Sequence, residues 1–286
     1  MKIVTNDYGC GTSSSILDYA IEDAIVVSED NWKFLLDVND DLFFVGHDFL
    51  MYLWDTPEKV QLWKNFSHNK LVWAFEPIDA IIKQWRMKSH YSMSHIVQFA
   101  DEIYACHEDD CKKYGYKFFP QWASCKFYEK RNNPVSNEKI LFSGQAGIPE
   151  YAVRNQLLQN LMMDKETKDR FLITNIKRSL TWEQYVDNLL KHDLILNPYG
   201  ILRAFNTRAY EVLYAGRFLL QHCFREEYSL HQELIKDVPN AITFFNKIDL
   251  MEKLENIDVS ITRDPTDFYQ KNNLYARFKA IGVELK

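Results

Sequence analysis

The 286 residues are enough for one large or two ordinary domains, and a hydrophobic content of 47% excludes an intrinsically disordered chain. A formal net charge of −6 disfavours nucleic acid as a partner, because polyanion-binding surfaces show an excess of Lys and Arg. No apolar run has the length of a membrane span and the N-terminus, MKIVTND, lacks a signal-peptide layout, so we expect a cytoplasmic protein.

The first half of the chain alternates short apolar runs with helical patterns. We expect a strand at 2–6, a Gly- and Ser-rich turn, and a helix at 16–24. The other elements predicted in this half are strands at 41–46, 70–75, 102–106 and 116–119, and helical stretches at 49–63, up to 100, and at 109–114. Strands that alternate with helices at this spacing are typical of a parallel, doubly wound sheet.

A charged, turn-rich segment at 128–138 marks a domain boundary, and the alternation starts afresh beyond it. The second half has predicted strands at 139–142, 171–174, 194–197, 218–221 and 242–245, and predicted helices at 151–163, 181–190, 206–215, 230–234, 248–254 and 267–278. Thr181 is the predicted N-cap of the helix at 181–190. The sequence therefore predicts an α/β protein of two Rossmann-like domains, 1–130 and 139–286, whose parallel sheets face each other across a cleft.

The stretch 194–222 combines two strands with a helix that opens near Asn206 and stops at Gly216. Asn206 is a preferred N-cap residue, and Arg208 and Glu211 share one face of the first helical turn. Free N–H groups and an arginine at a helix N-terminus form an anion site, and the glutamate indicates a ligand that also presents hydroxyls, as a ribose does. The alternative is a buried α/β crossover that contains a salt bridge.

A Gly-containing loop follows the first predicted strand. Ligands of open α/β sheets bind at the carboxyl ends of strands, so this loop is placed to line the predicted cleft. It matches neither G-x-G-x-x-G nor a P-loop, and the alternative is a plain strand-to-helix turn. The candidate residues of the loop are Gly9, Cys10, Gly11 and Thr12.

Five stretches of the second half follow one another in a characteristic order: KILFSG, EYAVRNQLLQNL, TWEQYVDNLLKHDLILNPYG, FNTRAYEVLYAGRFLLQH and NAITFFNKIDLMEKL. This order resembles the C-terminal half of GT-B glycosyltransferases, most closely the group-1-like set that includes CgeB-type proteins. The resemblance covers the second half only. The residues that match the family's motifs are Gly144, Arg154, Asn197, Pro198, Asn206, Arg208, Glu211 and Gly216.

The resemblance implies that the second domain binds a nucleotide-sugar donor of the UDP or GDP type. Arg208, with Asn206 and Thr207, would contact the diphosphate, and Glu211 would accept hydrogen bonds from the ribose. The further donor-side candidates are Gly144, Arg154, Lys177, Arg178 and Tyr199, for which the alternatives are a solvated basic pair (177–178) and loop packing (199). Position 203, eight residues before Glu211, is Arg203 where many retaining members carry a glutamate, so the resemblance does not carry over the retaining mechanism.

The catalytic base is sought in the first domain, which the resemblance makes the acceptor domain. Asp7, Glu76 and His107 each follow a predicted strand, and an inverting transfer needs a base for the acceptor hydroxyl. Each also has an alternative role that involves no catalysis. Asp7 could be a turn cap, Glu76 an ordinary residue before proline, and His107 a neighbour of a helix N-cap. In GT-B chains the last helix often crosses back to the first domain, and the resemblance implies the same for the helix predicted at 267–278.

No metal and no cofactor besides the sugar donor are expected. The sequence has no Asp-x-Asp motif, and its five cysteines are scattered without a C-x-x-C pair, which argues against a zinc site. The sequence thus predicts a metal-independent glycosyltransferase that acts on a hydroxyl of a glycan or other acceptor. The alternatives are a glycosyltransferase of hydroxymethyl-pyrimidine DNA bases and a non-catalytic two-domain protein that binds sugars or nucleotides.

Overall fold

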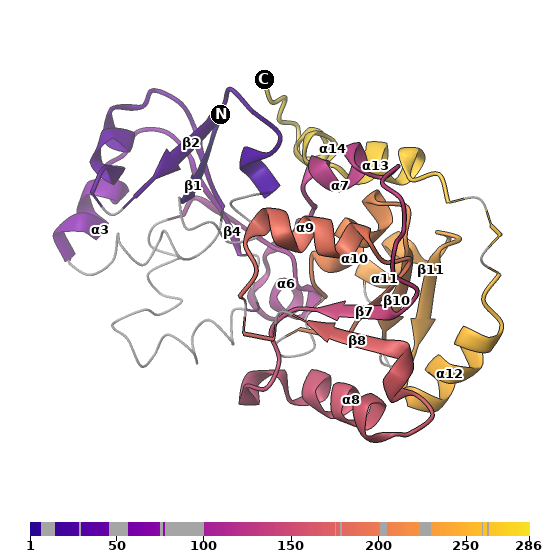
Figure 1. Cartoon of the computed structure of the whole chain (residues 1–286). Coiled ribbons are helices and arrows are strands. Elements are labelled where there is room, and N and C mark those ends of the chain that lie inside the picture. The colour runs from indigo at the N-terminus through magenta and orange to yellow at the C-terminus, as the bar shows by residue number, and fades with distance from the viewer. Residues whose placement is uncertain are drawn as a thin grey trace. The chain divides into compact units, whose positions relative to one another are not determined.

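The computed structural model of this chain consists of two compact units. The first is Met1–Gln121 together with Leu274–Lys286, and the second is Trp122–Asn273 (Figure 1). The residues that the structure describes are 1–6, 15–28, 30–45, 57–74, 77, 100–174, 176–177, 179–200, 205–223, 230–258, 260–261 and 263–286. Residues 122–130 fall in the second unit, whereas the sequence analysis assigns them to the first.

Each unit contains one parallel sheet, which confirms the predicted α/β class. In the described part of the first unit the strand order is β2-β1-β3-β4-β5-β6, and every neighbouring pair is parallel. The strands are β1 (Lys2–Asn6), β2 (Ala24–Val27), β3 (Leu42–Val45), β4 (Lys70–Ala74), β5 (Glu102–Ala105) and β6 (Lys117–Phe118). The helices among the described residues of this unit are η1 (Trp32–Asp37), α3 (Pro57–Lys64), α6 (Glu108–Tyr114) and α14 (Leu274–Ala280).

The prediction of a helix at 16–24 is wrong. Helical backbone covers only 15–17, and Ala20 adopts a positive φ of 50°. The chain then enters β2, which pairs in parallel with β1. The run Ala-Ile-Val-Val is rich in β-branched residues, whose stiff side chains favour a strand over a helix, so the local signal for β2 was present in the sequence.

The single helix predicted at 267–278 is two helices. The backbone of Asn273 is extended (φ −69°, ψ 170°), so α13 (Thr266–Asn272) ends there and α14 begins. Phe268 of α13 belongs to the core of the second unit. Phe278 of α14 packs on Phe43 of β3, with ring centroids 4.8 Å apart, inside the first unit. The last helix therefore belongs to the first unit.

The second unit has the strand order β11-β10-β9-β7-β8 among its described residues, again with parallel pairs throughout. Its strands are β7 (Ile140–Ser143), β8 (Phe171–Thr174), β9 (Leu194–Asn197), β10 (Phe218–His222) and β11 (Ala241–Phe244). Its helices besides α13 are α7 (Cys125–Glu129), η2 (Pro149–Tyr151), α8 (Ala152–Met163), η3 (Lys168–Arg170), α9 (Trp182–Leu190), α10 (Arg208–Tyr214), α11 (Leu230–Ile235) and α12 (Lys247–Glu255).

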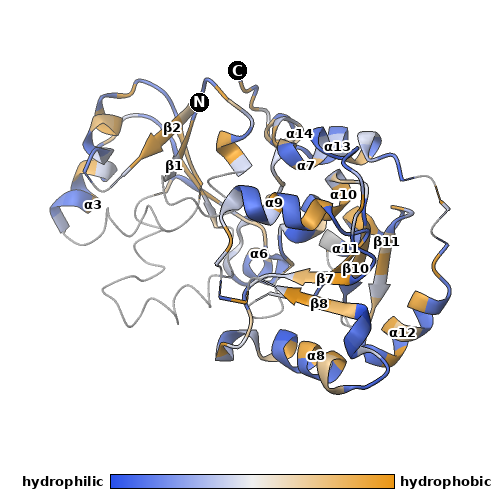
Figure 2. Cartoon of the chain, in the orientation of Figure 1, coloured by the Kyte–Doolittle hydropathy of each residue, from blue (hydrophilic) through white to orange (hydrophobic). Residues whose placement is uncertain are grey.

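Helices cover both faces of this second sheet. Alternate residues of the strands point to opposite faces, so Leu141 packs with α9 and α10 while Phe142 packs with α8 and α12. Figure 1 shows α9 and α10 on one side of the sheet and α8 and α12 on the other. In Figure 2 the strands β7 and β8 are mainly hydrophobic, whereas α8 and α12 carry both hydrophilic and hydrophobic residues. None of the helices described is long and apolar enough to span a bilayer.

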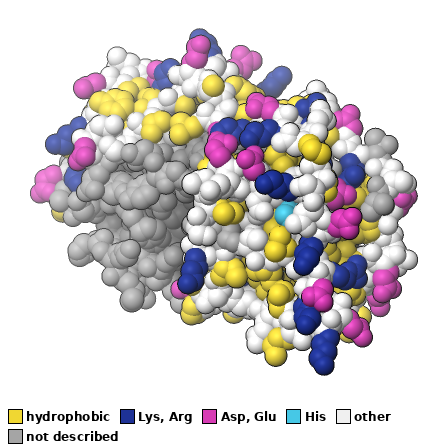
Figure 3. Space-filling view, in the orientation of Figure 1, with side chains coloured by type: hydrophobic (Ala, Val, Ile, Leu, Met, Phe, Trp, Pro, Cys, Tyr) yellow, Lys and Arg dark blue, Asp and Glu magenta, His cyan; other side chains and the backbone are white. Residues whose placement is uncertain are grey.

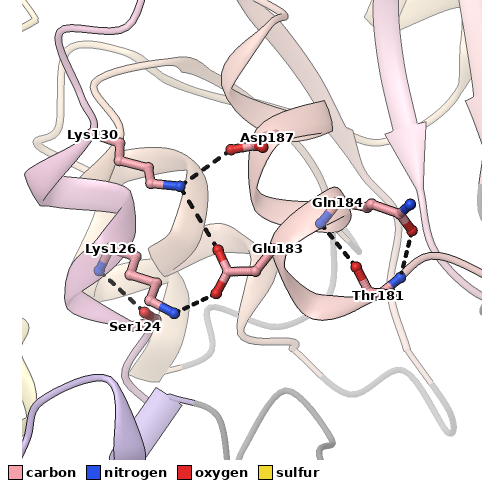
Figure 4. A network of polar contacts seen from close by, with 7 residues as sticks. All are labelled: Ser124, Lys126, Lys130, Thr181, Glu183, Gln184 and Asp187. Carbon is pink, nitrogen blue, oxygen red and sulfur yellow. Dashed lines mark hydrogen bonds and ion pairs between the residues drawn. The ribbon is translucent and has the colours of Figure 1, made fainter.

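The N-terminus of α9 is fixed by a capping box. The Thr181 hydroxyl accepts the backbone N–H of Gln184 at 3.2 Å, and the Gln184 side chain accepts the Thr181 N–H at 2.9 Å. The predicted cap at Thr181 is confirmed. Lys126 of α7 and Lys130, its C-cap residue, pair with Glu183 and Asp187 on the outer face of α9 (Figure 4). These exposed pairs contribute at most about 1 kcal/mol each, but they tie α9 to α7.

Gly216 ends α10 as the sequence predicts. Its φ is +63°, a conformation that glycine adopts without a Cβ clash. The N–H of Gly216 bonds to the carbonyl of Leu213, and the N–H of Arg217 bonds to the carbonyl of Val212, both at 3.1 Å. This is a Schellman motif, which satisfies the last carbonyls of the helix and turns the chain into β10.

Candidate functional site

The carboxyl ends of β7 and β9 bring several of the predicted donor-side residues together. Parallel strands of one sheet end at the same edge, where α/β proteins place their ligands. Nη1 of Arg208 donates to Oδ1 of Asn197, the last residue of β9, at 3.3 Å. Its Nη2 lies against Gly144, directly after β7: a Cβ at that glycine would be only 2.2 Å away. Gly144 therefore leaves room for the guanidinium.

Arg208 is a buried cation with spare hydrogen-bonding capacity. Its side chain is 9% exposed, and its guanidinium lies over the ring of Phe142 at 5.1 Å. Its Nε has no hydrogen-bond partner, and no described carboxylate forms an ion pair with the guanidinium. Buried charges are normally paired, so an unpaired arginine at this edge of a sheet is a candidate anion site.

The backbone amides at the start of α10 are not part of this anion site. Oδ1 of Asn206 accepts the N–H of Arg208 at 3.1 Å, and its Nδ2 donates to the carbonyl of Pro198 at 3.1 Å. The N–H groups of residues 209–211 bond to the carbonyls of Asn206 and Thr207. The sequence analysis expected free N–H groups here. In the structure the available positive charge is the Arg208 side chain instead.

Glu211 is buried and bonded to a residue that sequence reasoning missed. Its carboxylate accepts a hydrogen bond from the hydroxyl of Tyr185 on α9, and its exposure is 5%. Burial raises the pKa of Glu211, while the Tyr185 hydrogen bond and the charge of Arg208 oppose that rise. Burial and the Glu211 charge in turn raise the pKa of Tyr185.

A signal for Tyr185 did exist in the sequence. It lies four residues before Leu189 and one before Val186, on the part of α9 that packs against the sheet. A tyrosine on such a face usually finds a partner for its hydroxyl. Which partner it finds could not be read from α9, because Glu211 is 26 residues further along the chain.

Arg154 holds two loops together. Its Nε donates to the carbonyl of Tyr199 at 3.1 Å, and its Nη1 donates to the carbonyl of Gln145 at 2.7 Å. Its guanidinium also lies 4.1 Å from the ring centroid of Tyr151. The buried arginine thus joins the loop after β7 to the loop after β9, next to the strand ends that carry Gly144 and Asn197.

Tyr199 is also buried, beside the end of β10. Its ring centroid lies 5.7 Å from that of His222, and its hydroxyl accepts a hydrogen bond from Gln232 of α11 at 3.3 Å. The neighbouring Asn197 donates from Nδ2 to the Gln221 side chain at 2.7 Å. Side-chain amides and a tyrosine therefore line the strand ends on the β10 side of Arg208.

The remaining candidates lie elsewhere or outside the described residues. Lys177 is exposed, in the loop after β8. His107 belongs to the first unit, where it is buried at the N-cap position of α6 directly after β5 and Cys106. The candidates outside the described residues are Asp7, Gly9, Cys10, Gly11, Thr12, Glu76 and Arg178. Within the described part of the chain, no three His, Cys, Asp or Glu side chains are grouped so that they could hold a metal ion.

Two units, each with a parallel sheet covered by helices, are the build of the GT-B fold, the two-domain fold of many glycosyltransferases, and comparison with solved structures shows that fold. An alpha-glucosyltransferase in complex with UDP and a 13-mer DNA containing a central A:G mismatch superimposes with a TM-score of 0.59 at 10% identity, covering 91% of this chain and 84% of that one. Anabaena HepE in complex with UDP and glucose gives 0.53 at 12% identity, covering 99% and 98%. No family model matches the sequence, and no curated protein matches it significantly. The similarity to these structures establishes the fold.

Proposed function

We propose that this protein is a metal-independent glycosyltransferase that moves a sugar from a nucleoside-diphosphate sugar to a hydroxyl group. The observation that carries the proposal is the buried Arg208 guanidinium with its unpartnered Nε at the carboxyl edge of the second sheet. UDP is the first nucleotide to test, because the similar HepE structures hold UDP, UDP with glucose, or UDP-glucose. The CgeB-type resemblance and the cytoplasmic location remain predictions.

In the proposed reaction the second unit binds the donor. Arg208 neutralises the diphosphate as it leaves, which is the main electrostatic task of a transfer without a metal ion. Glu211 accepts hydrogen bonds from the ribose, since a carboxylate has about four acceptor positions and Tyr185 uses one of them. Gly144 leaves room for the guanidinium.

The acceptor side of the proposal rests on the first unit. Of the three proposed bases, His107 is the one that the structure describes, buried after β5 at the carboxyl end of the first sheet. Asp7 and Glu76 remain candidates from the sequence, as does the loop at 9–12. A glycan hydroxyl is the acceptor that we propose first.

The donor site is tested by isothermal titration calorimetry with UDP. Wild-type protein should bind UDP, and Arg208→Ala should weaken binding by about 10- to 150-fold, because a hydrogen bond to a charged group contributes roughly 1.5–3 kcal/mol. Arg131→Ala is the control, since the guanidinium of Arg131 lies over the Tyr128 ring and donates to a carbonyl in the same unit. Unchanged binding by Arg208→Ala, or no binding of any nucleoside diphosphate by the wild type, would overturn the proposal.

A DNA acceptor is the second candidate. One observation favours it: the solved alpha-glucosyltransferase similar in fold was captured with a DNA duplex. Against it stand the net charge of −6 and the described surface in Figure 3, on which acidic and basic side chains are interspersed. Incubation with UDP-glucose and duplex DNA carrying hydroxymethyl-pyrimidines, followed by mass spectrometry of the bases, decides between DNA and glycan acceptors. Turnover of any nucleotide sugar would exclude the non-catalytic binding protein.

A further inference from the structure

Arg208 and Glu211 have the spacing of an ion pair but do not form one. Residues three apart on a helix are neighbours, and opposite charges there usually pair directly. Here Arg208 acts on Glu211 through its charge, whereas the hydrogen bond to the carboxylate comes from the hydroxyl of Tyr185. The charge of Arg208 also opposes the rise in the pKa of this hydroxyl, so the hydroxyl lies near both charged side chains.

Tyr185 is held firmly in that position. Its ring stacks on Trp182 with centroids 5.7 Å apart and an interplanar angle of 27°, and it meets the ring of Phe127 edge-on at 6.4 Å. The helix that carries it is capped at Thr181 and tied to α7 by ion pairs (Figure 4). The ring contacts fix the direction in which the hydroxyl points, independently of any ligand.

We propose that Tyr185 is a positioning residue of the donor site: its hydroxyl holds the Glu211 carboxylate and thereby keeps the Arg208 guanidinium available for the nucleoside diphosphate. The inference rests on the proposed function of the site. It explains why Nε of Arg208 has no partner and why its only side-chain acceptor, Asn197, is at 3.3 Å, among the described residues. An arginine neutralised by a direct ion pair would offer less charge to an anion.

Removal of the hydroxyl has a definite consequence. Among the residues that the structure describes, the charged and titratable groups that face Glu211 are Tyr185 from α9 and Arg208 from its own helix. Without the hydroxyl, the buried carboxylate keeps only the arginine as a partner, so the two side chains should pair directly. The guanidinium is then drawn away from the diphosphate. Loss of the hydrogen bond also raises the pKa of Glu211 further.

The test compares the UDP affinity of five proteins by isothermal titration calorimetry at pH 7: the wild type, three single variants and one double variant. Tyr185→Phe removes the oxygen but keeps the stacked ring, and it should bind UDP about tenfold more weakly than the wild type. Tyr214→Phe is the matched control, because the Tyr214 hydroxyl donates to the carbonyl of Asn272 at 2.6 Å inside the core. It should lower the midpoint of thermal unfolding about as much as Tyr185→Phe does, with UDP affinity unchanged.

The remaining variants show whether Tyr185 acts through Glu211. In a Glu211→Gln background no carboxylate is left to trap Arg208, so adding Tyr185→Phe should leave UDP affinity unchanged within twofold. A tenfold loss that persists in that background would mean that the hydroxyl contacts the nucleotide itself, which overturns the positioning role. If the wild type binds UDP and Tyr185→Phe binds it equally well, the inference is overturned but the proposed function is not. Failure of the wild type to bind any nucleoside diphosphate overturns the proposed function, and the inference with it.

Discussion

The substitution Gly144→Ala tests the donor site through a contact of known geometry. A Cβ at position 144 would lie 2.2 Å from Nη2 of Arg208 and 3.2 Å from its Cζ. Ordinary van der Waals contact begins at 3.4 Å, so Nη2 must move by about 1.2 Å, the difference between 3.4 and 2.2 Å. The bond from Nη1 to Asn197 is already 3.3 Å long and should break.

The expected loss is in affinity and not in stability. The guanidinium is the end of a flexible side chain, so the fold can accept the methyl group, and Gly→Ala even reduces the entropy of the unfolded chain. The displaced charge no longer meets the diphosphate correctly. We expect UDP affinity to fall by about 10- to 100-fold, or roughly 1.4–2.8 kcal/mol.

Gly147→Ala provides the opposite control. Gly147 has a φ of +83° and nothing within 4 Å of the added Cβ, so this change strains the backbone without touching Arg208. It should destabilise the fold by about 1–2 kcal/mol and leave UDP affinity unchanged. Isothermal titration with UDP and urea unfolding of both variants give the comparison. The reasoning would be refuted if Gly144→Ala bound UDP within twofold of the wild-type affinity. It would also be refuted if adding Gly144→Ala to Arg208→Ala weakened UDP binding further.

Two further predictions concern stability. Arg154→Met should destabilise the protein by about 3 kcal/mol in urea unfolding, because it removes one buried and one partly buried hydrogen bond to backbone carbonyls. Arg131→Met should cost less than about 1 kcal/mol. If Arg154→Met instead abolishes UDP binding and leaves stability intact, Arg154 is a donor ligand and not a link between loops. Burial lowers the pKa of His222 below its usual 6.5, so protons favour the unfolded state: the contribution of His222 to stability is full above pH 6.5 and is lost as the pH falls. Between pH 7.5 and pH 5.5, protonation of this histidine should lower the free energy of unfolding by up to about 1.4 kcal/mol. This pH-dependent loss should be absent in His222→Gln. An equal loss in both proteins would contradict the assignment.

Local chemistry determined those parts of the fold that the sequence analysis predicted correctly. The strands at 171–174 and 194–197, the cap at Thr181 and the stop at Gly216 each depend on neighbouring residues: runs of apolar side chains, a hydroxyl in reach of the next turn, and a glycine that accepts positive φ. The break between two helices at Asn273 could not be predicted from local sequence. It arises because Phe268 before it and Phe278 after it pack in the cores of different units.

The sequence by itself determined that strands end beside Gly144 and Asn197 and that Arg208 and Glu211 share a helical turn. The tertiary structure alone decided how they are used. Whether Glu211 pairs with Arg208 or with Tyr185 depends on where α9 places its hydroxyl, and the need for glycine at 144 depends on where the guanidinium comes to rest. These contacts join residues 26 and 64 positions apart, so no local pattern encodes them, and they exist only once the strands and helices have packed.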